Sequence, residues 1–307
     1  MKRFLWPVLL ALLVISATPA HAQKKVKVVT TLTDLKSITE LIGGDKVDVT
    51  SIATGYQNPH FVDPKPSYIV KLSRADMFVT IGLDLEIGWV PPLLNSARNE
   101  KILKGGVGYV DTSANIPLLQ VPISVSREQG DIHIYGNPHY WLDPENGKII
   151  AQNIYEGLLR LRPEAQGYFT ANLKKFNDRL DAKNAEWEAQ MQPIKGADIV
   201  TYHDQWPYFE HHFGLNNAAY MEPKPGIPPT PSQLAKVIKI IQQRHVKVIV
   251  VAPYYRPNAA NLVARRTNAK VVKLASSVEA FKGINTYFDL FDYNVKLLVD
   301  AFGSAAP

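Results

Sequence analysis

Residues 163–192, PEAQGYFTANLKKFNDRLDAKNAEWEAQMQ, decide how this chain is organised. The apolar residues of this stretch recur at the spacing of a helix face: Phe169, Leu173, Phe176, Leu180 and Trp187. Pro163 at its start and Pro193 just after its end predict a single helix between them. About 30 helical residues would span roughly 45 Å. We therefore expect a stiff connector rather than a flexible hinge.

The chain on each side of this helix alternates between short β-rich runs and helical patterns. Before it, strands are expected at 26–30, 47–53 and 77–82, and helices at 33–42, 67–72 and 85–97. After it, strands are expected at 198–202, 218–221, 246–252 and 269–274, and helices at 206–213, 232–244, 258–267 and 285–302. Thr33 is expected to cap the first helix. Such alternation predicts an α/β lobe with a parallel sheet on each side of the connector.

The expected segments are a signal peptide at 1–22, an N-terminal α/β lobe at 23–160, a connecting backbone helix at 161–194 and a C-terminal α/β lobe at 195–307. The length agrees with two lobes, because about 285 residues after the signal exceed the usual size of a single domain. A single large α/β domain is the alternative.

The N-terminus has the features of a secretory signal peptide. Lys2 and Arg3 precede an apolar run at 4–15, and a small-residue cleavage site follows at 20–22. The run is too short for a membrane span, so no membrane insertion is expected. A lipid anchor would need a cysteine at the cleavage point, and the chain contains none. We therefore expect a freely soluble, monomeric protein in a periplasm, with a mature chain that begins near Gln23.

The composition excludes several classes of function. The absence of cysteine removes disulfides, thiolate metal ligands and cysteine nucleophiles. Without the expected signal, which carries Lys2 and Arg3, 32 basic residues face 28 acidic ones, and this net charge of +4 is too mild to predict a nucleic-acid partner. Any binding of a soft metal must therefore use histidine.

Three histidines occupy positions that suit ligand binding. His60 follows the second expected strand in Asn-Pro-His-Phe, His139 lies in Asn-Pro-His-Tyr-Trp-Leu-Asp-Pro, and His203 follows a strand of the second lobe. Ligands bind at the carboxyl ends of strands in open parallel sheets, and His60 and His203 fall at such ends in different lobes. The proline before His60 and before His139 keeps the backbone extended. One histidine alone is more often a hydrogen-bonding residue than a ligand, but the repeated setting favours a shared site.

Four segments also carry a resemblance to a known family. Residues 137–144 and 202–209, Tyr-His-Asp-Gln-Trp-Pro-Tyr-Phe, are similar to signature segments of the periplasmic zinc- and manganese-binding proteins of metal ABC importers, the cluster A-I solute-binding proteins. Pro-Ser-Gln-Leu at 231–234 and Tyr-Asn-Val at 293–295 look like further landmarks. The resemblance implies two lobes, each with a four-stranded parallel sheet flanked by helices, joined by one long rigid helix. It also implies capture of a divalent metal between the lobes and its delivery to the membrane permease of an ABC importer.

Carried over by position, the resemblance places the first three metal ligands on His60, His139 and His203. The fourth departs from the family pattern, because the place where the family usually has an aspartate is occupied by Asn285. Asp289, one helical turn further on and on the same face, is the alternative fourth ligand. An asparagine carbonyl can bind a metal, but without a charge it binds a dication more weakly than a carboxylate does.

Three neutral imidazoles with an oxygen or a water suit the tetrahedral preference of Zn²⁺, whereas Mn²⁺ favours more carboxylate oxygens. We therefore expect zinc, with manganese as the alternative, bound as transported ligand. Three histidines and a water also describe a hydrolytic site, but no glutamate is evidently placed beside them as a base, so no enzyme is expected. A binding protein for a small organic solute or metal chelate, and a metal-dependent adhesin or sensor domain, are the remaining alternatives.

The other histidines are given structural roles. His211 and His212 are neighbours on one expected helix and point to different sides, and His245 falls at a helix end, where a cation suits the helix dipole. His133 lies in a polar loop at 124–136, where similar proteins carry a histidine-rich segment. As the only histidine of that loop, it is interpreted as structural.

Overall fold

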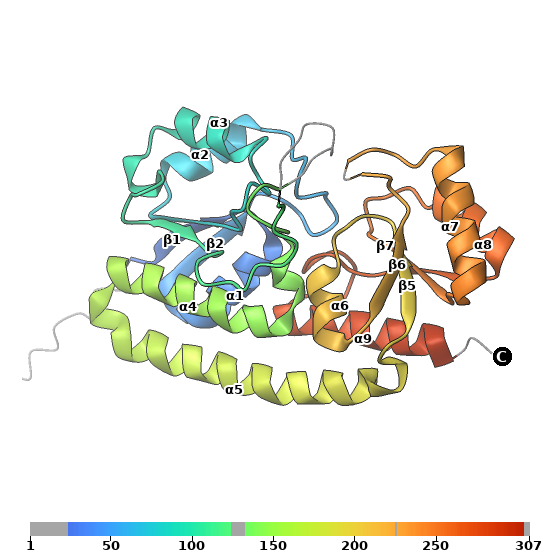
Figure 1. The fold of residues 1–307 in the computed structure, drawn as a ribbon. Coiled ribbons are helices and arrows are strands. Elements are labelled where there is room, and N and C mark those ends of the chain that lie inside the picture. The colour runs from blue at the N-terminus through green and yellow to red at the C-terminus, as the bar shows by residue number, and fades with distance from the viewer. Residues whose placement is uncertain (1–23, 124–132, 225, 304–307) are drawn as a thin grey trace, which may run out of the picture.

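The structure, a computed structural model, describes residues 24–123, 133–224 and 226–303 (Figure 1). The expected signal peptide therefore lies outside the described residues. The first sheet has four parallel strands in the order β2-β1-β3-β4. Its strands are β1 (Val26–Thr30), β2 (Val47–Ser51), β3 (Met77–Thr80) and β4 (Tyr109–Asp111). The strand expected at 26–30 is confirmed residue for residue, and β4 was not predicted.

The helices of this half are α1 (Thr33–Gly43), α2 (Pro66–Ser73), α3 (Val90–Ala97) and α4 (Pro144–Leu161), with short 3₁₀ turns at Gly44–Lys46, Glu100–Ile102 and Tyr140–Leu142. The expectation that Thr33 caps α1 is wrong. The cap residue is Leu32, and the Thr33 hydroxyl donates instead to the carbonyl of Val278, at 2.6 Å. The helix expected at 85–97 begins only at Val90, because the chain from 83 to 89 forms turns.

The second sheet repeats the pattern of the first, with parallel strands in the order β6-β5-β7-β8. Its strands are β5 (Asp198–Thr201), β6 (Asn216–Tyr220), β7 (Val248–Val251) and β8 (Lys270–Lys273). The helices of this half are α6 (Pro207–Phe213), α7 (Pro231–Arg244), α8 (Asn258–Thr267) and α9 (Tyr287–Gly303). The inner strands β3 and β7 are buried along their whole length, as expected for parallel sheets covered on both faces.

The predicted long helix is confirmed as α5 (Gln166–Met191), with 3₁₀ turns at Pro163–Ala165 and Gln192–Ile194 in place of its expected first and last turns. All five apolar residues that predicted it are buried. The helix packs against α1, α4 and α9, and Figure 1 shows it running beneath both halves of the molecule. It therefore braces the two sheets along one side.

The hydrophobic core is continuous between the two sheets. One large cluster of buried side chains runs from the first sheet through α5 and α9 to one face of the second sheet, and a smaller cluster covers the other face of the second sheet. The last helix, α9, contacts both α1 and α5. The start of the last helix thus helps to close the core of the first half.

Direct hydrogen bonds join the segment 276–287 to the first half, and we call this contact the 276–287 seam. The N–H of Val278 donates to the carboxyl of Asp34 at 3.0 Å, and the indole N–H of Trp141 donates to the carbonyl of Ser276 at 3.0 Å. The hydroxyl of Tyr287 donates to the carbonyl of Trp141 at 2.7 Å. The seam fixes how the two sheets lie relative to each other.

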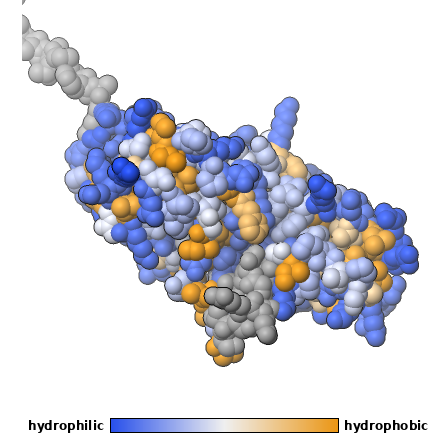
Figure 2. All heavy atoms as spheres, turned by 90° about the horizontal axis from the view of Figure 1, so that it is seen from above, coloured by the Kyte–Doolittle hydropathy of each residue, from blue (hydrophilic) through white to orange (hydrophobic). Residues whose placement is uncertain are grey.

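The surface seen in Figure 2 is mostly hydrophilic, with separate hydrophobic spots. Several of the exposed large hydrophobic residues belong to loops that follow strands of the first sheet, among them Phe61, Ile87 and Tyr135. No helix within the described part of the chain has both the length and the apolar character needed to cross a membrane.

Candidate metal centre

Three histidines from separate loops meet between the two sheets. His60 follows β2, His139 directly precedes the turn that leads to α4, and His203 follows β5. One potential ligand atom from each lies within 4.8 Å of those of the others. The Nε2 atoms of His60 and His139 are 3.1 Å apart, close to the roughly 3.3 Å between two nitrogens bound to the same tetrahedral zinc. The structure thus brings together the three histidines that the sequence singled out.

The Asn-Pro-His repeat owes its shape to its asparagines as well as to its prolines. The side-chain oxygen of Asn58 accepts the backbone N–H of His60 at 3.0 Å, and Asn137 does the same for His139, also at 3.0 Å. Such a side-chain-to-backbone bond two residues on makes a compact turn that asparagine favours. The expectation that proline alone presents these imidazoles was therefore incomplete, because the asparagines also fix the turns.

Second partners orient the imidazoles of His139 and His203. The side-chain oxygen of Asn137 accepts from Nδ1 of His139 at 2.9 Å, and the carboxylate of Glu222 contacts Nδ1 of His203 at 2.7 Å. In both cases the oxygen is the acceptor, so Nδ1 carries the proton and the lone pair is on Nε2. Nε2 of His203 is buried and has no hydrogen-bond partner among the described residues. Both rings therefore offer Nε2 to the centre.

Glu222 lies beside the histidines, where the sequence indicated no glutamate placed as a base. Its carboxylate reaches His203 on the Nδ1 side and also accepts the backbone N–H of Gly226, at 3.3 Å. It faces away from the Nε2 atom that points to the other two histidines. Glu222 therefore orients an imidazole and is not placed as a base for a metal-bound water.

Burial keeps two of these imidazoles neutral. Removal from water lowers the pKa of His60 and of His139 well below the ordinary value, and the neighbouring histidines lower both pKa values further. A neutral imidazole is the form that binds a metal. No proton has to leave either ring before a metal binds at neutral pH.

The structure places the two candidates for the fourth ligand at the start of α9. Asn285 is exposed, and its backbone N–H donates to the carboxylate of Asp289 at 3.0 Å. The same carboxylate accepts the N–H of Thr286 at 2.8 Å, so it caps the helix. Asp289 does not belong to the histidine group. The prediction of a fourth ligand at Asn285 or Asp289 thus finds no support in the contacts of the described residues.

The remaining histidines divide into two kinds. His211 is exposed, His245 ends α7, and His212 contacts the carboxylate of Asp143 at 3.0 Å and the side-chain oxygen of Asn184 at 2.8 Å. These environments agree with structural roles. His133 differs, because its ring stacks on that of His60 with centroids 5.0 Å apart.

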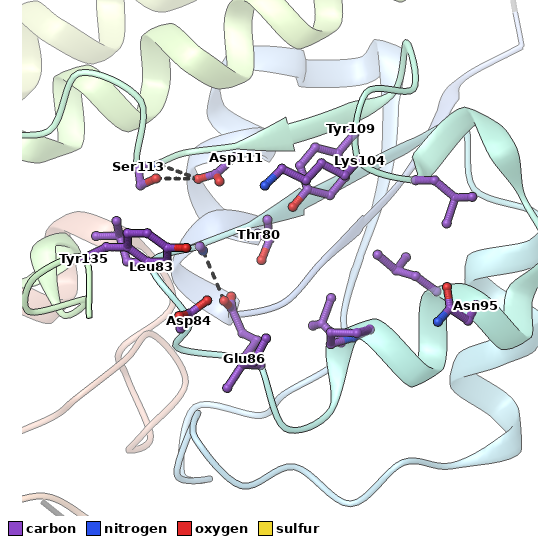
Figure 3. Close-up of a pocket in the computed structure, with 16 residues that line it drawn as sticks. Thr80, Leu83, Asp84, Glu86, Asn95, Lys104, Tyr109, Asp111, Ser113 and Tyr135 are labelled. Atoms are coloured by element: carbon purple, nitrogen blue, oxygen red, sulfur yellow. Dashed lines mark hydrogen bonds between the residues drawn. The ribbon is translucent and has the colours of Figure 1, made fainter. Parts of the chain in front are cut away.

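A cavity of about 710 Å³ lies beside the centre, at the carboxyl ends of β3 and β4 (Figure 3). Its lining includes Thr80, Asp111 and Glu86, and the three histidines are not part of it. Glu86 accepts the N–H groups of Ile81 and Gly82, and burial raises its pKa to about 7. This carboxyl holds a turn of the chain in place rather than facing the histidines.

Residues 28–301 match the family model described as "Zinc-uptake complex component A periplasmic", ZnuA. The chain belongs to this family. ZnuA-type proteins are the metal-binding components of ABC transporters, so this chain is an extracytoplasmic solute-binding protein for a divalent metal and not an enzyme. The resemblance noted in the sequence, and the expectation of two four-stranded parallel sheets joined by a long helix, are confirmed.

Similar proteins carry different metals in their names. The manganese ABC transporter substrate-binding lipoprotein PsaA of Streptococcus mitis is 27% identical over 289 residues, which are 92% of this chain and 90% of the relative. A zinc-bound ZnuA deletion mutant superposes with a TM-score of 0.76 at 24% identity, over 92% of this chain and all of the other. FpvC of Pseudomonas aeruginosa with Mn²⁺ gives 0.77 at 24% identity over the same shares. These two structures establish the ZnuA-like fold and leave the metal open.

Proposed function

We propose that this protein captures zinc in the periplasm, with His60, His139 and His203 as ligands, and delivers it to the permease of an ABC importer. The observation that carries the proposal is the convergence of imidazole nitrogens from both halves on one point. Within the described residues, the group includes no carboxylate. Nitrogen ligands suit zinc, whereas Mn²⁺ prefers a shell richer in oxygen.

The fixed tautomers of His139 and His203 support the same conclusion. Because Asn137 and Glu222 hold Nδ1 of these rings, Nε2 is directed at the centre before a metal arrives. Loss of a group that orients a metal-binding imidazole in this way typically weakens metal affinity by about 10- to 100-fold. A site with rings already oriented is suited to tight capture from dilute solution.

The family and the N-terminus support the proposed location and partner. The signal-like residues 1–22 favour export to the periplasm, where a solute-binding protein meets its permease. We take the working unit to be a monomer, since each chain supplies all three histidines of its own site.

The test is the metal content and the separate metal affinities of the protein purified from an export-competent host grown with both metals. We expect one bound zinc per chain and a Mn²⁺ affinity at least about 1,000-fold weaker, as nitrogen ligands and the Irving–Williams order predict. Most sites bind zinc more tightly than manganese in vitro. The decisive measurement is therefore which metal is bound to the exported protein when it is isolated. Protein isolated with bound manganese in place of zinc would contradict the proposal.

A further inference from the structure

His133 has the surroundings of a metal ligand. Its Nε2 atom is buried and has no hydrogen-bond partner among the residues that the structure describes. Its ring centroid lies 5.0 Å from that of His60 and 6.3 Å from that of His139. The three histidines of the metal centre have centroids 5.1 to 5.5 Å apart. The fourth ring therefore joins the same cluster at a similar spacing.

The other ring nitrogen of His133 is tied to the backbone. The carbonyl of Leu83 accepts a hydrogen bond from the ring, and because Nε2 is unpartnered, the donor is Nδ1. This repeats the arrangement at His139 and His203, whose Nδ1 atoms also face an oxygen. The proton is on Nδ1 in all three rings, and each Nε2 has a lone pair for a metal.

The backbone that supplies this carbonyl has an unusual conformation. Leu83 and Asp84 have φ values of 51° and 62°, in the left-handed region that residues with a Cβ rarely adopt. Glu86 holds the turn by accepting the N–H groups of Ile81 and Gly82. Figure 3 shows Leu83 and Asp84 at the edge of the cavity, whose lining also includes Tyr135. The strained turn thus lies against the segment that carries His133.

A glycine turn brings His133 back toward His139. The N–H of Gly136 donates to the carbonyl of His133 at 3.2 Å, and Gly136 has a φ of 120°, which favours glycine. The chain reverses between the two histidines, so their rings approach the same centre from one segment. The turn therefore adds a second imidazole from the first half beside His139.

We propose that His133 is the fourth ligand, so that the captured metal is held by four imidazoles. This inference rests on the proposed metal site at His60, His139 and His203. His133 is not in the group whose ligand atoms lie within 4.8 Å of one another, so its ring moves a short way toward the ion on binding. Four nitrogens complete the tetrahedral shell of zinc. An oxygen from Asn285 or Asp289 is then not needed.

The test compares the parent protein with His133→Ala, both loaded with Co²⁺, by proton NMR in water. Each imidazole bound through Nε2 contributes one exchangeable, hyperfine-shifted Nδ1–H resonance. We expect His133→Ala to lose one of these resonances and to bind zinc about 10 to 100 times more weakly. His211→Ala, which removes an exposed histidine, is the matched control and should keep both the spectrum and the affinity.

A His133→Ala protein with the parent's resonances and affinity would overturn the assignment. A thermal melt of the metal-free variant checks that it folds, and His133→Gln, which keeps the bulk of the side chain, should lose the same resonance. The proposed function is judged separately by His139→Ala. If that variant loses zinc binding while His133→Ala does not, the three-histidine site stands and only the fourth ligand is wrong.

Discussion

Two of the places where the halves of the molecule meet are built differently. At the 276–287 seam, polar groups of one half bond directly with polar groups of the other, as Val278 does with Asp34 and Ser276 with Trp141. At the metal centre, imidazole nitrogens from both halves point toward one another instead. The seam joins donors directly to acceptors across the two halves, although Asp34 Oδ2 and Ser276 Oγ are buried without a partner among the described residues. The metal centre instead presents unpaired ring nitrogens.

This difference shows which contact sets the geometry. The seam and α5 hold the two sheets in place. The imidazoles of His60 and His203 therefore face each other without help from a metal. The free energy of metal binding is then not used to close the two halves, which is the general advantage of a preorganised site. Each region can be broken separately, and the expected losses differ in kind.

The largest effect is expected at the seam, from the buried carboxyl of Asp34. Burial raises its pKa to about 7 from the ordinary 3.8. An acid with a raised pKa in the folded state contributes stability below its unfolded pKa, and this is lost as the pH rises through the folded value. Asp34→Asn does not titrate at this position. We therefore expect its unfolding free energy, relative to that of the parent, to increase by up to about 4 kcal/mol as the pH rises from 4 to 8.

Urea unfolding of both proteins across this pH range measures the difference. Other titrating groups are present in both proteins and cancel. Asp178→Asn removes an exposed carboxylate that pairs with Lys174, and should change the unfolding free energy by less than about 1 kcal/mol at every pH. A difference between Asp34→Asn and the parent that stays constant from pH 4 to pH 8 would contradict the assignment.

The next effect in size is expected at the metal centre. Replacing His139 or His203 with alanine should weaken zinc binding by about 100-fold or more, because each removes one ligand of the proposed site. Competition with a chelator of known affinity measures the loss. Without metal, the melting temperatures of these histidine variants should change much less than that of the seam variant Asp34→Asn. Equal zinc affinity in both variants and the parent would show that the site lies elsewhere.

A smaller effect is expected from the residue that orients His203. Glu222→Ala should weaken zinc binding by about 10- to 100-fold, since the imidazole loses its fixed tautomer. Glu222→Gln keeps an oxygen at the same place and should recover much of the loss. The same chelator competition applies. If the glutamine and alanine variants behave alike, the charge of Glu222 matters and its hydrogen bond to Nδ1 does not.

Most of the fold could be predicted because its signals are local. The helix at 258–267 and the strand at 26–30 match the structure, since apolar periodicity and turn residues mark them directly. The strand at 109–111 is too short to show a period. Helix α4 was missed because Gly147 and Gly157 weaken its pattern. Packing requires both glycines. A Cβ at Gly147 would lie 2.6 Å from Tyr287, and a Cβ at Gly157 would lie 2.4 Å from Val110.

The three histidines of the metal centre could be found in the sequence, but most of their partners could not. His60 and His139 stand in a repeated motif that is visible in one dimension. Glu222 is 19 residues from His203, and only the pairing of β5 with β6 brings them together. The contact of His133 with Leu83 likewise depends on a turn in another part of the first half. Such tertiary contacts leave no local pattern to read.

The contact between the start of α9 and the first half limits how this protein can change. Because Tyr287 and the helix that it begins lie in the same hydrophobic core as the first sheet, a chimaera joined at the connecting helix would combine a core from two parents. Recombination between relatives would have to exchange the seam, the connector and the last helix together. New metal preferences therefore arise more readily by substitution in the loops at the strand ends than by exchange of halves.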